Sequence, residues 1–489
     1  MHRWGLCALV VCLVAACPAT AGAAPTAWSG GALRLNDPAM TFGGDQRGVR
    51  EPVIAIDPSS PNVVLAAAID QNPQNQVPEA DGWGGWNHIY RSTDGGATWS
   101  DGPMIHWPDP SHTWSTGDPS LAFAADGTAY LVSLNVNIDQ PHKRQIEVYR
   151  SNDQGQTWSG PTLAFDGTYD PANGRCVSGD KELGTVDQRT GELLVVYTQT
   201  TWGCGSVPDD FFTDEVGTVP PDGVIQVVLT RSSDGGSTWT KPQPIWNDHY
   251  AIGAKPVVGP DGTIYVAFSA ATPLGSNLSC PSTLGTLGSY ALRGATLVVA
   301  SSHDDGATWS YEKRGLCEAV LAEEQKSDQE GKADPTLGAF VPTISVDPVS
   351  GRAVVAWPTF AAHPPAASFG VKTMSSTDGG QTWSPTTDLT PPAQDAVLPA
   401  LASDAGRTWA TWVASTDDWN TYSAYAAEST GGDAWSAPLT LSSEAGTAGG
   451  EIGDYVSMDA AGGRVAAIWT QGDPSNGLGP FARTGTYTP

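Results

Sequence analysis

The stretch Ser92-Thr93-Asp94-Gly95-Gly96-Ala97-Thr98-Trp99 is the first of five copies of one pattern, Ser-x-Asp-x-Gly-x-Thr-Trp. The other full copies begin at Ser151, Ser232, Ser302 and Ser376, and the aspartates of successive copies lie 59, 81, 70 and 74 residues apart. A shortened sixth copy runs from Ser429 to Trp435. Repetition at such spacings is typical of folds that stack one supersecondary unit many times.

Each copy is predicted to be a turn between two β-strands. A β-prone run precedes it, as at Ile146–Tyr149. The aspartate can accept hydrogen bonds from amides of its own turn, and the glycine adopts backbone angles that other residues avoid. The tryptophan is a large apolar wedge that can fold back against the sheet. We therefore assign these aspartates to turn formation rather than to catalysis or calcium binding.

A second pattern alternates with the first: an apolar strand, a tight turn and another apolar strand. It occurs seven times, at Pro52–Ala68, Pro119–Ser133, Glu182–Thr198, Pro256–Ser269, Pro342–Trp357, Pro399–Val413 and Tyr455–Thr470. Turn sequences such as Asp126-Gly127 are strong hairpin signals.

An inner hairpin followed by an outer hairpin makes a four-stranded sheet, and such sheets arranged radially make a β-propeller. The sequence therefore predicts an all-β fold, a β-propeller of four-stranded blades, with seven blades, or six if one hairpin is misassigned. The last blade has the outer strand Phe481–Thr486 with no partner after it. We expect Ala32–Asn36 to supply that partner and close the ring, which removes open sheet edges.

The eight-residue repeat resembles the Asp-boxes, or bacterial neuraminidase repeats, of the sialidase superfamily, over nearly the whole chain after residue 23. The resemblance implies a propeller and an extracellular, often glycan-directed protein. It does not by itself imply sialidase chemistry, because a fold hosts many functions.

Sialidases bind the sialic acid carboxylate with three arginines and use an aspartate acid/base and a tyrosine nucleophile assisted by glutamate. The resemblance makes Arg50, Asp70 and Tyr455 candidate catalytic residues, with Glu215 and Arg231 completing the set. Arg231 directly precedes a repeat, no third arginine matches, and seven blades would depart from the six of sialidases.

The irregular segments at the ends of the predicted strands are rich in aromatic residues, which stack on sugar rings. The candidates for ligand binding are Trp83, Trp86, Trp107, Trp114, Trp202, Trp246 and Tyr250. His112 and Asp109, near His106, form the densest group able to transfer protons, and a hydrolase or polysaccharide lyase can use such groups.

Four carboxylates stand where the innermost strands begin: Glu51, Asp118, Asp180 and Asp454. These positions converge on the central channel of a propeller, and clustered carboxylates repel unless a cation relieves the repulsion. We therefore expect calcium or a similar cation at the channel mouth. The alternative is pairing with Lys181, Lys255 or backbone amides.

The composition narrows the class of partner. The 489 residues contain 24 Lys and Arg against 52 Asp and Glu, a net charge of −28, which disfavours nucleic acid. Residues 1–23 read as a signal peptide, so we expect secretion, although Val14–Cys17 also resembles a lipobox that would anchor a lipoprotein through Cys17. No later stretch is long enough to span a bilayer.

Residues 24–489 are predicted to form one propeller domain with an insertion at 311–340, in which Cys317–Gln329 favours a short helix. Four cysteines lie beyond the signal region, and we expect the disulfides Cys176–Cys204 and Cys280–Cys317. We expect a monomer.

Two functions remain open from the sequence. One is a secreted glycan-processing hydrolase or lyase, and the other is a non-catalytic propeller that binds a polysaccharide or a protein.

Overall fold

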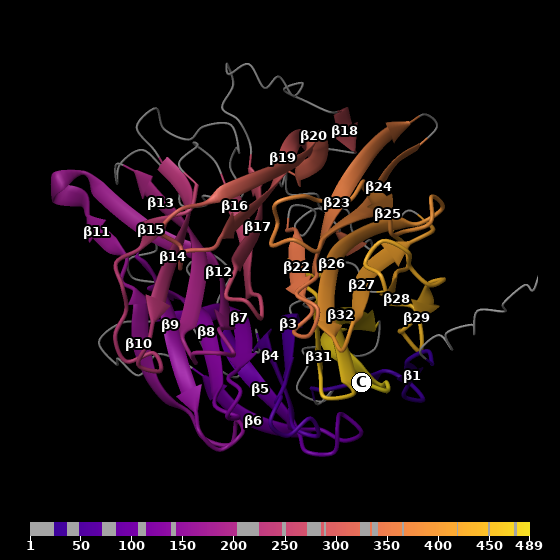
Figure 1. The fold of residues 1–489 in the computed structure, drawn as a ribbon, viewed down its shortest axis with the longest axis horizontal. Helices are drawn as coiled ribbons and strands as arrows, with labels where there is room; N and C mark the ends of the chain where they lie inside the picture. The colour runs from indigo at the N-terminus through magenta and orange to yellow at the C-terminus, as the bar shows by residue number, and fades with distance from the viewer. Residues whose placement is uncertain are drawn as a thin grey trace, which may run out of the picture.

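The computed structural model describes residues 24–36, 48–70, 85–105, 114–137, 143–202, 224–246, 251–270, 285–287, 290–322, 333–334, 341–363, 366–417, 419–447, 450–473 and 477–489. Their strands form seven antiparallel sheets arranged in a ring, which confirms the seven-bladed β-propeller. The chain passes once around the ring, so the first and last blades are neighbours (Figure 1).

The blades follow the chain in order, with the innermost strand first in each. Blade 1 contains β3 (Val49–Ile56), β4 (Val64–Asp70), β5 (Trp86–Ser92) and β6 (Ser100–Ile105). Blade 2 contains β7 (Trp114–Phe123), β8 (Ala129–Asn137), β9 (Arg144–Ser151) and β10 (Ser159–Phe165). Blade 3 contains β12 (Arg175–Val186), β13 (Leu193–Trp202), β14 (Val224–Ser232) and β15 (Gln243–Pro244), with β11 (Thr168–Asp170) added beside β12.

The second half of the ring repeats this plan. Blade 4 contains β16 (Ala251–Val258), β17 (Ile264–Ala270), β19 (Tyr290–Ser302), β20 (Ser310–Ala322) and the short β18 (Gly285–Leu287). Blade 5 contains β22 (Thr343–Val346), β23 (Ala353–His363), β24 (Ala366–Ser376) and β25 (Thr387–Asp388). Blade 6 contains β26 (Asp395–Asp404), β27 (Arg407–Ser415), β28 (Ser423–Ser429) and β29 (Leu439–Thr440).

Blade 7 is closed by the N-terminal segment. Its strands β31 (Ser457–Ala461), β32 (Arg464–Asp473) and β33 (Gly477–Thr486) are followed by β1 (Ala27–Trp28) and β2 (Leu33–Arg34), which both pair with β33. The predicted ring closure is therefore confirmed, and the N-terminal segment lies next to the C-terminus in Figure 1.

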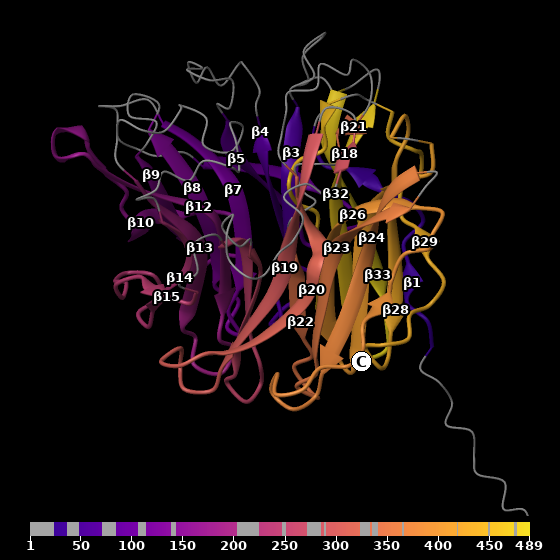
Figure 2. The same ribbon diagram turned by 90° about the horizontal axis from the view of Figure 1, so that it is seen from above.

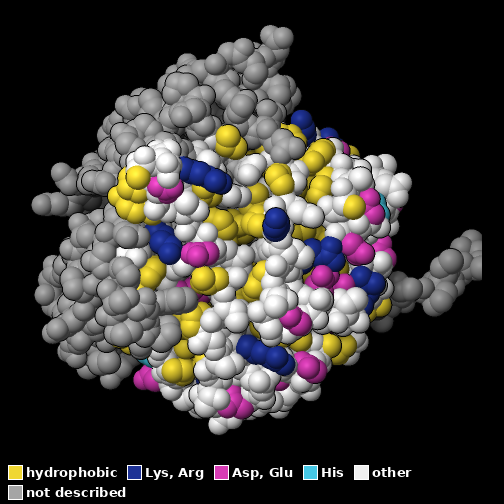
Figure 3. Space-filling model, turned by 90° about the vertical axis from the view of Figure 1, so that its left-hand side faces the viewer, with side chains coloured by type: hydrophobic (Ala, Val, Ile, Leu, Met, Phe, Trp, Pro, Cys, Tyr) yellow, Lys and Arg dark blue, Asp and Glu magenta, His cyan; other side chains and the backbone are white. Residues whose placement is uncertain are grey.

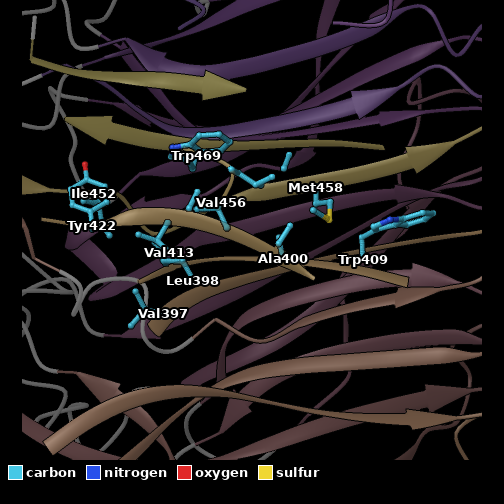
Figure 4. Packing of buried hydrophobic residues seen from close by; sticks show 14 of the residues in the cluster. Val397, Leu398, Ala400, Trp409, Val413, Tyr422, Ile452, Val456, Met458 and Trp469 are labelled. Carbon is cyan, nitrogen blue, oxygen red and sulfur yellow. The ribbon is translucent and has the colours of Figure 1, made fainter. Parts of the chain in front are cut away.

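The core lies between the blades because each inner hairpin packs on both of its faces. Every residue of β4 and of β27 is buried, which explains why β4 is apolar from Val64 to Ile69 without interruption. One cluster joins blades 6 and 7, where Trp409, Met458 and Trp469 pack together (Figure 4).

The predicted insertion has a different structure from the expected helix. The part up to Ala322 is strand β20, which pairs with β19 from Ser310 to Ala322. The helix prediction is wrong for these residues because cross-strand pairing outweighs a weak helix propensity. Further along, β21 (Ala333–Asp334) pairs in parallel with β30 (Gly450–Glu451), just before blade 7 (Figure 2).

The two ends of the propeller carry different features. Innermost strands begin at one end, which we call the channel mouth, and antiparallel pairing places the eight-residue repeats, between the third and fourth strands, at the opposite end. In the first repeat the Asp94 side chain accepts hydrogen bonds from the hydroxyls of Ser92 (2.8 Å) and Thr98 (2.6 Å). The other four full repeats form the same bonds.

These repeats also connect neighbouring blades. Arg91, one residue before the first repeat, donates from Nε to the carbonyl of Gln154 in the second repeat (2.8 Å). On the side of the molecule shown in Figure 3, basic and acidic side chains are interspersed among uncharged ones, and the described residues of this face form no continuous basic stripe. No helix in the described part of the chain is long and apolar enough to cross a membrane.

Candidate active site at the channel mouth

A β-bulge interrupts the innermost strand of several blades near the channel mouth. In blades 1, 2 and 3 the first bulge residue is Glu51, Asp118 or Lys181, with a φ of 55°, 42° and 51° respectively. Gly253 and Leu398 take the same left-handed conformation in blades 4 and 6. A left-handed conformation strains a non-glycine residue, and bulges commonly re-aim side chains beside functional sites.

The bulges of blades 1, 2 and 3 and the segment that leads into β31 bring side chains together in a group that we call the mouth cluster. Its members are Glu51, Asp118, Lys181, Asp454 and Tyr455. The Lys181 ammonium forms ion pairs with Asp118 (3.4 Å) and with Asp454. The Tyr455 hydroxyl donates to Asp118 (3.4 Å), and its ring centroid lies 5.3 Å from the Lys181 ammonium.

Glycine is required where blades 7 and 1 meet in this cluster. Gly453 has a φ of 83°, and a Cβ atom there would lie 2.8 Å from Cγ of Glu51. A side chain at position 453 would therefore displace Glu51 as well as strain the backbone.

Burial and charge separate the protonation states of Glu51 and Asp118. Burial, reinforced by Asp118 and Asp454, raises the pKa of Glu51 well above its usual value. Burial opposes ionisation of Asp118 as well, but Lys181 and a hydrogen bond from Glu51 bring its pKa below the usual value. The surroundings thus favour the protonated form of Glu51 and the ionised form of Asp118, the arrangement that divides acid and base roles in many enzymes.

The sequence predicted a calcium-like cation among the four carboxylates. In the structure, the positive charge next to two of them is the ammonium of Lys181. Asp180 instead pairs with Arg144 and accepts a hydrogen bond from the Lys181 amide (2.7 Å). Among the described residues, no three His, Cys, Asp or Glu side chains are grouped so as to hold a metal ion. The alternative of lysine pairing therefore describes Asp118 and Asp454, whereas Asp180 pairs with an arginine and Glu51 forms no ion pair among the described residues.

Two of the sialidase candidates lie close together. Tyr455 belongs to the mouth cluster, and Arg50 is near enough to lower the pKa of Asp454, although burial leaves that pKa raised overall.

The other two described candidates differ in position. Asp70 ends β4, where it pairs with Val49 beside Arg50, and its carboxylate lies 3.5 Å from His88. Arg231 is at the opposite end of the propeller, where it binds Glu192. Arg231 is therefore not part of a group with Arg50 and Tyr455, and Glu215 lies outside the described residues.

Only some of the aromatic residues predicted to bind a ligand lie within the described residues. Trp86 and Trp114 begin β5 and β7 at the channel-mouth end, and both are half-buried. Trp246 is buried among Phe268 and Tyr311, with the Lys313 ammonium 4.7 Å above its ring, so it packs rather than presents a face. Trp202 ends β13. The remaining candidates lie outside the described residues, namely Trp83, Trp107, Tyr250, His106, His112 and Asp109.

Sequence reasoning missed a buried polar group between blades 1 and 2. Glu147 on β9 accepts hydrogen bonds from the Tyr149 hydroxyl (2.7 Å) and from the Asn135 amide. Burial raises the pKa of Glu147 to about 8. The only available signal was a carboxylate within the apolar run Ile146–Tyr149.

The predicted cysteine pairs are only partly within the described residues. Cys176 is buried at the start of β12 and forms a disulfide bond. Its predicted partner Cys204 lies outside the described residues, as do Cys280 and the side chain of Cys317. Both pairings stay predictions, and so do the signal peptide and the Cys17 lipobox.

Geometry thus defines the class, a seven-bladed β-propeller with a charged cluster at one end of its channel. No family model matches the chain. It is 27% identical over 197 residues to a xyloglucanase from Paenibacillus sp., an alignment that covers 33% of this chain and 18% of that one. The chain thus spans less than a fifth of the length of this relative.

Solved structures with a similar fold include glycan-acting propellers. The GH93 α-L-arabinofuranosidase of Fusarium graminearum with arabinobiose has a TM-score of 0.48 and 15% identity, covering 93% of this chain and 97% of that one. The Hadza microbial sialidase Hz136 has a TM-score of 0.45 and 16% identity, covering 83% and 73%. The likeness concerns the fold alone.

Proposed function

We propose that this protein is a secreted glycoside hydrolase whose catalytic groups belong to the mouth cluster. The observation that carries the proposal is the contact of Glu51 with Asp118 in the mouth cluster, where the surroundings raise the pKa of the Glu51 carboxyl and lower the pKa of the Asp118 carboxyl. A protonated carboxyl and a carboxylate are the two groups that glycoside hydrolysis requires, about 5–9.5 Å apart, so this proposal needs Glu51 and Asp118 to separate when the sugar binds. The partial alignment with a xyloglucanase agrees with a glycan substrate.

In this proposal Glu51 donates its proton to the leaving glycosidic oxygen, and Asp118 acts at the anomeric carbon as nucleophile or as base for water. Lys181 keeps Asp118 ionised, since the ammonium lies 3.4 Å from its carboxylate. A bound sugar enters between Glu51 and Asp118 and replaces the hydrogen bond that joins them. Trp86 and Trp114, at the same end of the propeller, are placed to stack on flanking sugars.

Glu51→Gln tests the assignment, because glutamine keeps the shape and cannot donate the proton. We expect kcat on polysaccharides to fall about 100-fold or more, with KM little changed. Glu147→Gln is the matched control, since it makes the same change at a buried site away from the mouth cluster. Undiminished kcat in Glu51→Gln contradicts the assignment of Glu51 as the acid.

A second candidate is a non-catalytic propeller that binds a polysaccharide or a protein. It is favoured by the burial of the cluster, whose Lys181, Asp118 and Asp454 side chains are only 9–11% exposed. Binding to glycans by calorimetry, with no reducing ends or unsaturated sugars released from neutral and anionic polysaccharides, supports this candidate over hydrolysis.

A further inference from the structure

The mouth cluster has unsatisfied hydrogen-bonding atoms, and all of them are acceptors. Oε2 of Glu51 and Oδ1 of Asp454 are buried and have no hydrogen-bond partner among the described residues. The two residues are only 6% and 7% exposed. Buried polar atoms are normally satisfied, so these oxygens call for a donor from outside the described chain.

The cations that act on the mouth cluster each interact with a carboxylate. Lys181 is shared between Asp118 and Asp454, and Arg144 is paired with Asp180. Arg50 acts electrostatically on Asp454. Lys255, which follows the bulge of β16, interacts electrostatically with Asp459 and not with a member of the mouth cluster. The described basic groups beside the cluster are therefore already matched by carboxylates.

We propose that the mouth cluster selects uncharged, hydroxyl-rich sugars and rejects sugars that carry a carboxylate, such as sialic and uronic acids. A sugar hydroxyl donates a hydrogen bond to the waiting oxygens of Glu51 and Asp454. A sugar carboxylate has only acceptor oxygens, and it would meet Asp118 and Asp454 with the nearby cations already paired. This inference rests on the proposed function and names its substrate class.

Matched pairs of glycans test the selection directly. Binding of lactose is compared with binding of sialyllactose, and binding of arabinan and xyloglucan oligosaccharides with binding of oligogalacturonate, by isothermal titration calorimetry on the mature protein. We expect the uncharged ligands to bind at least 10-fold tighter. Equal or tighter binding of the anionic ligands overturns the selection and leaves glycan binding intact. Absence of binding to every glycan overturns the proposed function and the selection with it.

Asp454→Asn tests whether the cluster causes the selection. The amide adds a donor and leaves Lys181 with one carboxylate, so the preference for uncharged ligands should fall at least 10-fold. Asp153→Asn makes the same change in net charge at the opposite end of the propeller and should leave the preference unchanged. An unaltered preference in a folded Asp454→Asn protein, verified by circular dichroism, overturns the assignment of the selection to this cluster. If Asp454→Asn does not fold, Tyr455→Phe is measured with the same glycans. This variant removes the hydroxyl that donates to Asp118, so binding of any anionic ligand should weaken further. Tighter binding of the anionic ligands would overturn the assignment.

Discussion

At the scale of single residues, Lys181 determines whether the mouth cluster is stable. It adopts a φ of 51° on a bulge, and its ammonium is the shared partner of Asp118 and Asp454. Burial alone would lower its pKa, yet Asp118 and Asp454 hold that pKa well above the usual value. The lysine therefore stays charged in a nearly buried place, and it offsets the repulsion between carboxylates from blades 2 and 7.

Removing this ammonium should destabilise the protein strongly. In Lys181→Met the side chain keeps its length, but Asp118 and Asp454 lose their cation. Breaking one partner of a buried pair costs about 3–5 kcal/mol, which denaturant unfolding at pH 7 measures. Lys181→Arg, which keeps the charge, should recover much of the loss. Equal stability of wild type and Lys181→Met contradicts a stabilising role for the pair.

Glu147 makes stability depend on pH in a predictable direction. Its pKa is about 8 in the folded protein against an ordinary value near 4.5, so the folded state binds the proton more tightly than the unfolded state. Its contribution therefore favours the folded state most below about pH 4.5, and it is lost as pH rises to about 8. The full effect is at most about 5 kcal/mol.

Glu147→Gln should flatten this dependence, because glutamine stays neutral across the whole range. The measurement is the free energy of unfolding by denaturant at intervals from pH 5 to pH 8.5. Wild type should lose stability across that range more steeply than the variant. Parallel curves for the two proteins contradict the prediction.

At the scale of elements, the repeats form the turns between strands that the sequence predicts. The Ser-x-Asp-x-Gly-x-Thr-Trp pattern predicts the hydrogen bonds of its turn, since the donors and acceptors all lie within seven consecutive residues. A related turn escaped detection: Ser415, Asp417 and Thr421 form the same bonds, but Trp419 occupies the glycine position with a φ of 59°. A sequence pattern thus predicts such a turn only where the residues of the pattern, including the glycine, are present.

The candidate site was less predictable, for a physical reason. The entry positions Glu51, Asp118 and Asp454 followed from the hairpin count, because the innermost strands of a closed ring converge. Which of them pair depends on bulges that turn each side chain, and those depend on contacts between blades. The pairing of Lys181 with Asp118 and Asp454 and the contact of Asp70 with His88 follow from such long-range packing, which no local pattern encodes.

The repeat aspartates should affect stability and leave function alone. Hydrogen bonds from Thr157 and Ser151 lower the pKa of Asp153 to about 2. This contribution is present above the ordinary pKa and is lost as pH falls toward 2. Asp153→Ala should therefore lower Tm at pH 7 and lower it less at pH 2.5, with glycan binding at the opposite end unchanged. Glu444→Ala, an exposed carboxylate outside the repeats, is the control and should leave Tm nearly constant.

At the scale of the whole molecule, the propeller depends on one closure. Blade 7 would end at β33 as an open edge if β1 and β2 did not pair with it. Side chains reinforce this pairing: the Trp409 indole donates to the Thr26 hydroxyl (2.8 Å), which itself donates to Glu428 (2.5 Å). The N-terminal segment thereby also ties blade 7 to blade 6.

A chain that begins at residue 37 should consequently be much less stable than one that begins at residue 24. It loses the pairing along β33. It also loses the burial of the Trp28 and Leu35 side chains, and burial of these two side chains contributes about 3–5 kcal/mol. It also exposes β33, and an unpaired strand edge is a template for association between chains. We expect a lower Tm and concentration-dependent oligomers by light scattering. Thr26→Val in the chain from residue 24 removes only the side-chain bonds and should lower Tm slightly without oligomers. Identical melting and monomeric behaviour of the two truncated chains would show that blade 7 closes the ring without its N-terminal strands.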